Sequence, residues 1–151
     1  MIWIGVDPGA KGGYCQIRTY GNGEVGVMAF PWDNDEFVDF MRDVPTDFEP
    51  VRCVVEKVGA MPGNGSVSMF NFGRSYGFIL GVLAAFNIPF QTVAPREWKK
   101  EFGLNSDKAK SIEVCHRLFP ELDLRRTERC RTDSDGKAES ALLAEWCRRH
   151  M

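Results

Sequence analysis

The hydrophobic pattern of the first thirty residues predicts three antiparallel strands. An apolar run over 2–6 ends on a carboxylate and a Pro-Gly pair, which favours a short buried strand. Residues 14–19 and 24–29 alternate between apolar and polar positions, and the Tyr-Gly-Asn-Gly segment 20–23 between them is a strong hairpin signal. Two successive hairpins make a three-stranded meander.

Beyond residue 32 the pattern changes to alternating helices and strands. A 3.6-residue period predicts helices, and short apolar runs predict strands. In chain order we expect a helix over 33–44, a strand over 51–56, a flexible loop over 59–68, a long apolar helix over 69–86, a strand over 89–93, a short basic amphipathic segment over 95–102, a helix over 108–119, an arginine-rich connector over 125–132 and a helix over 134–150. This order indicates a single α/β domain over 1–151 with a mixed five-stranded sheet: three antiparallel strands, then two parallel ones, flanked by helices.

The composition fits a small soluble domain. Of the 151 residues, 44% are hydrophobic and 26% charged, and 19 Lys and Arg against 21 Asp and Glu give a net charge of −2. This balance excludes a histone-like nucleic-acid binder but allows a local basic groove. We expect no signal peptide and no membrane-spanning segment. The five cysteines are scattered without a C-x-x-C pair, which argues against a zinc site and favours reduced thiols in the cytoplasm.

Four carboxylates at particular points of this pattern suggest a metal site. Asp7 and Glu56 end two apolar strands. Asp135 and Glu139 are four residues apart near the start of the last helix and therefore share a face. If the helix packs on these strands as neighbours, the acids converge, and clustered anions are stable only with bound cations or protons. Without His or Cys they select Mg²⁺ or Mn²⁺, and two such ions clamp the attacking and leaving oxygens of a phosphoryl displacement.

Each of these acids also has a structural interpretation. Asp7 could be only a turn residue, whereas Glu56 is harder to explain because glutamate is rarely buried unpaired. Asp135 and Glu139 could serve the helix dipole, and Asp133 could be the ligand in place of Asp135. The set of four, more than any single acid, indicates the site.

The order of these residues resembles that of the RuvC-like Holliday-junction resolvases of the RNase H-like superfamily, especially the small phage-borne members. The resemblance covers nearly the whole chain. It rests on Ile4-Gly5-Val6-Asp7-Pro8-Gly9, on Val54-Val55-Glu56, on the helix containing Gly73-Arg74-Ser75-Tyr76-Gly77, on Val93-Ala94-Pro95-Arg96-Glu97-Trp98-Lys99-Lys100 with Phe102-Gly103 and Ser106-Asp107-Lys108-Ala109-Lys110, and on Asp135-Gly136-Lys137-Ala138-Glu139-Ser140-Ala141-Leu142-Leu143.

The resemblance implies an RNase H-like fold and a homodimeric, Mg²⁺-dependent endonuclease that cuts Holliday junctions with symmetric nicks. Two Mg²⁺ per site, replaceable by Mn²⁺, would be held by the four acids, and cleavage would leave 5′-phosphate and 3′-hydroxyl ends. A lysine at the position of Lys108 lies near the scissile phosphate in the family, and the free N–H groups at a helix start also favour a phosphate there. The expected DNA contacts are Lys99, Lys100, Lys108, Lys110 and Arg74.

The long helix over 72–86 is similar to the helix that these enzymes use for dimerisation. Its glycines recur at a spacing of four, and its apolar residues lie on nearly all sides. We therefore expect one side of this helix to pack on the sheet and the other on a second subunit, which would match the near two-fold symmetry of a four-way junction.

Two features depart from the family pattern. The last two acids are four residues apart, whereas the cellular bacterial enzymes have them three apart, which leaves Asp133 open as a ligand. The stretch after Glu56 lacks the family's aromatic wedge, and we consider Met61 and Phe70 as residues that contact unstacked bases. His116 has no visible partner and is interpreted as a packed or surface residue, whereas Trp98 is interpreted as a core or half-buried residue.

Other functions remain open on the sequence. The same fold could cut flaps, forks or RNA–DNA hybrids, or it could serve as a non-catalytic DNA-binding module, although the retention of all four acids speaks against the latter. The D-P-G-x-x-x-G segment is also similar to the first phosphate loop of the actin and sugar-kinase superfamily. Those proteins enclose ATP between two such domains, and 151 residues supply one.

Overall fold

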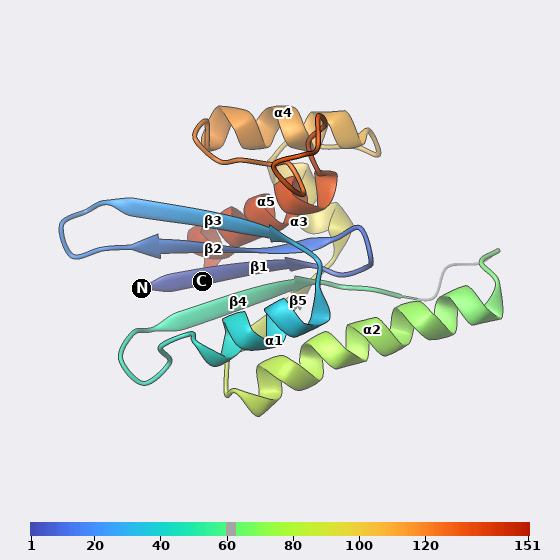
Figure 1. Cartoon of the computed structure of the whole chain (residues 1–151), viewed down its shortest axis with the longest axis horizontal. Coiled ribbons are helices and arrows are strands. Elements are labelled where there is room, and N and C mark those ends of the chain that lie inside the picture. The colour runs from blue at the N-terminus through green and yellow to red at the C-terminus, as the bar shows by residue number, and fades with distance from the viewer. Residues whose placement is uncertain (60–62) are drawn as a thin grey trace.

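The computed structural model describes residues 1–59 and 63–151 and has the predicted α/β architecture (Figure 1). Its elements are β1 (Ile2–Asp7), β2 (Gly13–Thr19), β3 (Val25–Pro31), α1 (Asn34–Arg42), β4 (Val51–Glu56), α2 (Ser66–Ala85), β5 (Phe90–Val93), α3 (Pro95–Glu101), α4 (Lys108–Leu118) and α5 (Asp135–His150). The five strands form one sheet in the order β3-β2-β1-β4-β5. β2 is antiparallel to β1 and β3, whereas β4 runs parallel to β1 and β5, so the predicted mixed sheet is confirmed.

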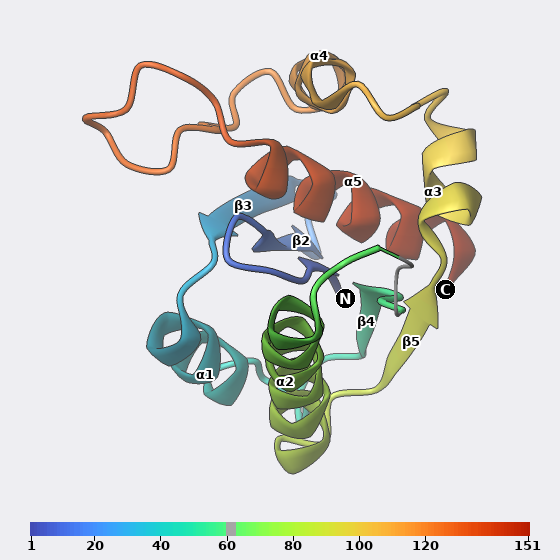
Figure 2. The ribbon, with the colours of Figure 1, turned by 90° about the vertical axis from the view of Figure 1, so that its right-hand side faces the viewer.

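Helices cover both faces of the sheet (Figure 2). α5 lies on one face with α3 and α4, and α1 and α2 cover the other. Side chains of a strand alternate between the two faces, so each strand contributes to two separate cores. In β4, Val54 belongs to the core beneath α5, whereas Cys53 and Val55 belong to the core beneath α2. The apolar run that predicted β4 is therefore a strand buried on both faces.

The structure corrects the predicted start of the long helix. α2 begins at Ser66, so residues 66–68, expected in the loop, are helical. The basic segment over 95–102 forms α3, which starts with Pro95 at its first position, where a missing N–H costs no helical hydrogen bond. The expected base contact Met61 lies outside the described residues. In the part of the chain that is described, no helix is long and apolar enough to cross a membrane.

Two glycines allow α5 to lie directly on the sheet. A Cβ atom at Gly5 in β1 would lie 2.2 Å from the Ala144 nitrogen and 2.3 Å from the Ser140 oxygen. A Cβ atom at Gly136 would lie 2.1 Å from the Lys11 carbonyl oxygen. These neighbours are backbone atoms, which cannot rotate aside as a side chain can. The backbone of α5 therefore touches that of β1 and of the β1–β2 turn, which fixes the height of the helix above the sheet.

We expect Gly5→Ala to destabilise the protein strongly, because its methyl group would push α5 off the sheet. Overpacking of this kind costs about 1–3 kcal/mol, and more where only backbone can yield. The measurement is the free energy of unfolding from urea titrations followed by circular dichroism. Gly21→Ala is the matched control, since a Cβ at Gly21 meets no described atom within 4 Å. Equal stability of the two variants would contradict the backbone contact.

Candidate active site at the carboxyl ends of β1 and β4

The four predicted acids lie around one cavity. Asp7 and Glu56 are the last residues of β1 and β4, which are parallel neighbours, so both side chains reach the same edge of the sheet. Ser134 caps α5 by accepting a hydrogen bond from the Lys137 nitrogen, which places Asp135 in the first helical turn and Glu139 one turn later. The cavity has a volume of about 400 Å³ and is lined by all four acids together with residues 8–12, Phe72 and Lys108.

Burial and mutual repulsion act on the two strand carboxylates. The pKa of Asp7 is raised well above its ordinary value, first by burial and then by the charges of Glu56 and Glu139. Burial also raises the pKa of Glu56, although a hydrogen bond from Trp98 opposes the shift. No described residue donates a hydrogen bond to the Asp7 carboxylate. The surroundings of Asp7 therefore disfavour its charged form, and a bound cation would stabilise that form.

Two lysines neutralise the acids of α5. The Lys99 ammonium lies 3.1 and 3.3 Å from the two carboxylate oxygens of Glu139, and the Ser111 hydroxyl donates to the same carboxylate at 3.0 Å. Lys108 Nζ lies 2.5 Å from Asp135 Oδ2, and this hydrogen bond raises the pKa of Lys108. Lys99 thus neutralises Glu139, and Lys108 neutralises Asp135.

Trp98 holds Glu56 by a hydrogen bond that the sequence did not reveal. Its indole Nε1 donates to Glu56 Oε2 at 2.7 Å, while the ring itself is completely buried. The sequence analysis interpreted Trp98 only as a packing residue. The two residues are 42 positions apart, and no local pattern relates an indole N–H to a carboxylate at that separation.

The donor set fits a hard divalent cation. It consists of carboxylate oxygens without His or Cys, which is the chemistry that Mg²⁺ and Mn²⁺ prefer. The unpartnered carboxylate of Asp7 and the repulsion among the acids supply the electrostatic reason for a cation at this point. In the arrangement of the described residues, no three Asp, Glu, His or Cys side chains are close enough to one another to hold an ion. Cation binding therefore requires the carboxylates to draw together.

The structure separates the two candidate ligands of the last helix. Asp135 lines the cavity, whereas Asp133 lies outside its lining and its Oδ2 is 2.6 Å from His116 Nε2. His116 therefore has a partner that was not visible in the sequence. The same holds for His150, whose Nε2 lies 2.5 Å from Glu101 Oε2. The geometry favours Asp135 over Asp133 as the acid of the site.

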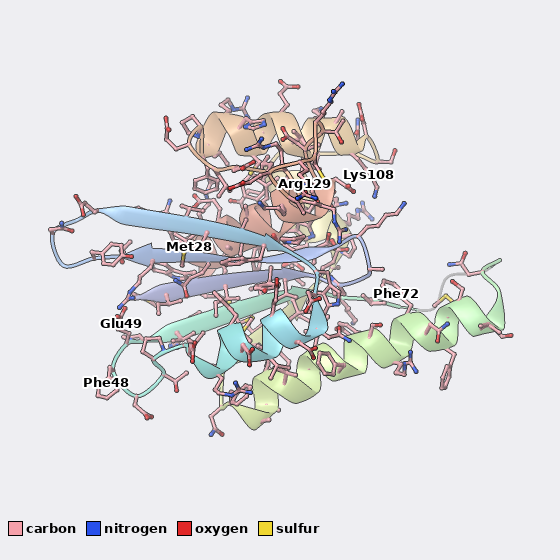
Figure 3. All side chains as sticks on the ribbon, viewed as in Figure 1. Met28, Phe48, Glu49, Phe72, Lys108 and Arg129 are labelled. Carbon is pink, nitrogen blue, oxygen red and sulfur yellow. The ribbon has the colours of Figure 1, made fainter. Side chains whose placement is uncertain are left out.

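The aromatic side chain at the cavity is Phe72, which the sequence analysis had placed in the dimerisation helix only. Phe72 lines the cavity from the first half of α2, and it lies at the same end of the sheet as Lys108 (Figure 3). Phe70, the expected base contact, is 71% exposed and does not line the cavity. The sequence analysis missed this role because the packing of α2 against the sheet, which no local pattern reports, decides which of its side chains reach the acids.

The predicted DNA contacts divide into two groups. Lys99 and Lys100 line a second, basic cavity of about 590 Å³ together with Arg96 and the turn at 103–106. Lys110 and Arg74 are exposed on α4 and α2 and line neither cavity. α3 connects the two cavities. Lys99 of α3 lines the basic cavity, and its ammonium binds Glu139, which lines the carboxylate cavity.

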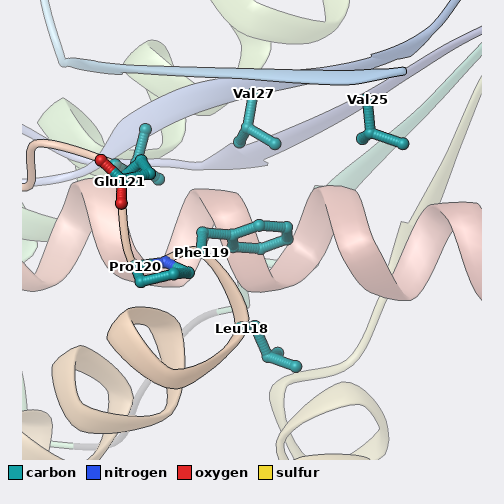
Figure 4. Close-up of a pocket in the computed structure, with 7 residues that line it drawn as sticks. Val25, Val27, Leu118, Phe119, Pro120 and Glu121 are labelled. Carbon is teal, nitrogen blue, oxygen red and sulfur yellow. The ribbon is translucent and has the colours of Figure 1, made fainter.

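A third cavity has no chemistry of this kind. It has a volume of about 350 Å³ and lies between β3 and the end of α4 (Figure 4). Its lining is apolar apart from Glu121: Val25, Val27, Leu118, Phe119, Pro120, Glu121 and Leu122. We therefore place the candidate site at the acids.

Comparison with known proteins agrees with this fold. No known family profile matches the chain. A crossover junction endodeoxyribonuclease RuvC of Chlorobium chlorochromatii is 28% identical over 111 residues, which is 66% of this chain and 56% of the relative. The match thus spans little more than half the length of that curated relative.

Solved structures match over nearly the whole chain. Thermus thermophilus RuvC has a TM-score of 0.61 at 15% identity, covering 99% of this chain and 96% of the other. T. thermophilus RuvC in complex with a Holliday junction substrate has a TM-score of 0.62 at 13% identity, covering 95% and 90%. The yeast mitochondrial Holliday junction resolvase Ydc2 has a TM-score of 0.53 at 14% identity, covering 98% and 83%.

The mixed five-stranded sheet and the helices that flank it define an RNase H-like α/β fold. The particular fold is that of RuvC and related Holliday-junction resolvases, and the predicted resemblance is confirmed in sequence and in fold.

We expect Asp7→Asn to stabilise the metal-free protein at neutral pH. The pKa of Asp7 is higher in the folded state than its unfolded value of about 3.9, so the folded state binds more protons between these two pKa values. The free energy of unfolding therefore falls as the pH rises from the unfolded pKa through the folded pKa. Removal of this unfavourable buried charge stabilises the protein by about 1–2 kcal/mol, or roughly 2–8 °C in Tm for a chain of this size. The difference from wild type should vanish towards pH 4.

Thermal melts at pH 4 and pH 7.5, with EDTA and with Mg²⁺, measure this effect. Mg²⁺ should raise the Tm of the wild type and leave that of Asp7→Asn unchanged. Asp47→Asn, an exposed acid in the loop before β4, serves as control and should melt like the wild type in every condition. A lower Tm for Asp7→Asn in EDTA would mean that Asp7 is stabilised in the fold by a contact other than a cation.

Proposed function

We propose that this protein is a structure-specific endonuclease that resolves Holliday junctions and related branched DNA by hydrolysing phosphodiester bonds. The observation that carries the proposal is the meeting of Asp7, Glu56, Asp135 and Glu139 at one cavity, with Lys108 among its lining residues. This arrangement occurs on the fold that RuvC of T. thermophilus has in its Holliday-junction complex. The four acids come from three elements, and a purely structural role does not require them to meet.

The proposed site takes two Mg²⁺ ions, with Mn²⁺ as a substitute, held by the four acids. When bound, such ions activate water and stabilise the departing 3′ oxygen of an in-line displacement. Lys108 is exposed and ends in an ammonium at the cavity, so it can leave Asp135 and stabilise negative charge on the scissile phosphate. Lys99 is half-buried against Glu139 and holds that carboxylate in place. The products carry 5′-phosphate and 3′-hydroxyl ends.

The basic cavity beside α3 supports binding of the DNA backbone. Arg96, Lys99 and Lys100 line this cavity, and lysine and arginine side chains are the residues that bind the phosphates of a DNA backbone. Lys110 and Arg74 extend the contact across α4 and α2. The net charge of −2 is no obstacle, because the acidic stretch over 33–49 lies in a different part of the chain. The buried cysteines suit the reducing cytoplasm in which we place this activity.

We propose further that two copies of the chain pair through α2. A Cβ atom at Gly73, Gly77 or Gly81 would meet no described atom within 4 Å, so the glycine stripe faces open space. Val67 is 73% and Phe70 71% exposed on the same helix, an unusual exposure of apolar surface for a monomer. A second copy packed on this stripe would give a two-fold dimer with one site for each of two opposed strands.

We expect cleavage of a labelled four-way junction in the presence of Mg²⁺, at paired symmetric positions, with its linear duplex arms left intact. EDTA should abolish cutting, and Glu56→Gln should slow it by roughly 100-fold or more, since groups that stabilise transition-state charge have effects of this size. Glu97→Gln, an exposed acid on α3, is the matched control and should cut at the wild-type rate.

The other outcomes of this assay separate the remaining functions. Equal cutting of junctions, flaps, forks and RNA–DNA hybrids would keep the metal site and reject junction specificity. Tight junction binding without cutting would indicate a non-catalytic DNA-binding module. Unchanged cutting by Glu56→Gln would reject the carboxylate site itself.

We expect Gly77→Leu to convert the dimer into a monomer without harm to the fold. Leucine is a better helix former than glycine, and the position is open in the single chain, so only packing of the second copy should suffer. Sedimentation equilibrium measures the change, and junction nicks should lose their pairing. Gly21→Leu, which adds the same side chain at an open turn, should remain dimeric. A wild-type protein that sediments as a monomer would reject the pairing through α2.

A further inference from the structure

The hydrogen bond from Trp98 to Glu56 has a consequence for the proposed metal site. We propose that Trp98 is a positioning residue: by binding Oε2 of Glu56, its indole N–H fixes the rotamer of the carboxylate and leaves Oε1 to the cation. This inference rests on the proposed function, because it assigns Trp98 a role towards the same ion. It concerns metal affinity and can be measured without DNA or cleavage.

The indole is a rigid donor. Trp98 has no exposed surface and packs in the core beneath α5, with its ring 6.5 Å from the ring of Phe102 at an interplanar angle of 64°. A ring held in this way cannot follow a moving carboxylate, so Glu56 must adapt to the indole. Outer partners of metal-binding side chains act by this kind of orientation.

Other indoles in the chain show that the fold does not demand such a partner. Trp3 is half-buried, yet its Nε1 is buried with no hydrogen-bond partner among the described residues. Trp32 donates to Asn34 only two positions away. Of these three donors, only that of Trp98 reaches an acid of the cavity. The Trp98 contact is therefore more than the routine pairing of a buried N–H group.

α3 connects the two acids through consecutive residues. Trp98 binds Glu56 of β4, and the next residue, Lys99, binds Glu139 of α5. The end of α3 is joined to the end of α5, because Glu101 accepts one hydrogen bond from Arg149 at 3.0 Å and lies 2.5 Å from Nε2 of His150. Through these two contacts α3 sets the separation between Glu56 of β4 and Glu139 of α5. Loss of the indole N–H would remove the contact to Glu56 and leave only the contact to Glu139.

A positioning role and a purely structural role predict different measurements. If Trp98 only packs, its loss lowers stability and leaves cation affinity as it was. If it positions Glu56, its loss weakens cation binding, and it does so only while Glu56 is present as a carboxylate. A double-mutant cycle between the two residues distinguishes these cases.

The test measures Mn²⁺ affinity without DNA, from the electron paramagnetic resonance signal of free Mn²⁺. Trp98→Phe should weaken binding by roughly 10- to 100-fold, the range found for outer partners of metal ligands. In the Glu56→Gln background the same substitution should have no further effect. Trp146→Phe, which removes the same volume from a buried position in α5, is the matched control and should bind Mn²⁺ like the wild type. Circular dichroism verifies that each variant is folded.

A second measurement needs no variant that might fail to fold. In the wild-type protein with ¹⁵N-labelled indoles, Mg²⁺ should shift the Nε1–H resonance of Trp98 and leave those of Trp3 and Trp146 in place. Wild-type affinity in Trp98→Phe, or an unshifted Trp98 resonance with Mg²⁺ bound, overturns the positioning role while the metal site stands. Wild-type affinity in Glu56→Gln overturns both, because the proposed site itself is then absent.

Discussion

The backbone contact between α5 and β1 is the constraint on which the rest of the site depends. Gly5 and Gly136 have no Cβ atoms, which at these positions would clash with backbone atoms of α5 and of the β1–β2 turn. The backbone of α5 can therefore pack directly against main-chain atoms of the sheet. At this height the first two turns of α5 lie beside the carboxyl ends of β1 and β4. Asp135 and Glu139 thereby join Asp7 and Glu56 at one cavity, which a helix one side chain further out could not achieve.

Gathering four acids in this way places unfavourable electrostatics at one edge of the sheet. The raised pKa of Asp7 records both its burial and the neighbouring charges. Lys99 and Lys108 relieve the acids of α5, and Trp98 relieves Glu56, but Asp7 has no comparable partner among the described residues. The site therefore combines fixed backbone positions for the four acids with a carboxylate whose charge is not compensated, a combination that favours cation binding.

The two faces of the sheet serve different purposes. The face under α5 carries the acids, whereas the other face is covered by α2, whose glycine stripe and exposed apolar residues remain open. Phe72 connects the two, because it belongs to α2 and lines the carboxylate cavity. A partner bound along α2 would therefore sit close to the site, and pairing of two copies would orient two cavities relative to each other.

The sequence by itself determined the order of the elements, the mixed sheet and the candidate acids, because strand period, helix period and turn residues are local signals. It placed Asp7 and Glu56 at strand ends, where parallel neighbours must bring them together. Only the tertiary structure decided that Asp135 lines the cavity while Asp133 pairs with His116, that Phe72 faces the acids, and that Trp98 reaches Glu56. These contacts depend on how closely each helix packs on the sheet and which of its faces it turns towards the acids. Trp98 and Glu56 are 42 positions apart, and no local sequence pattern reports a contact at that separation.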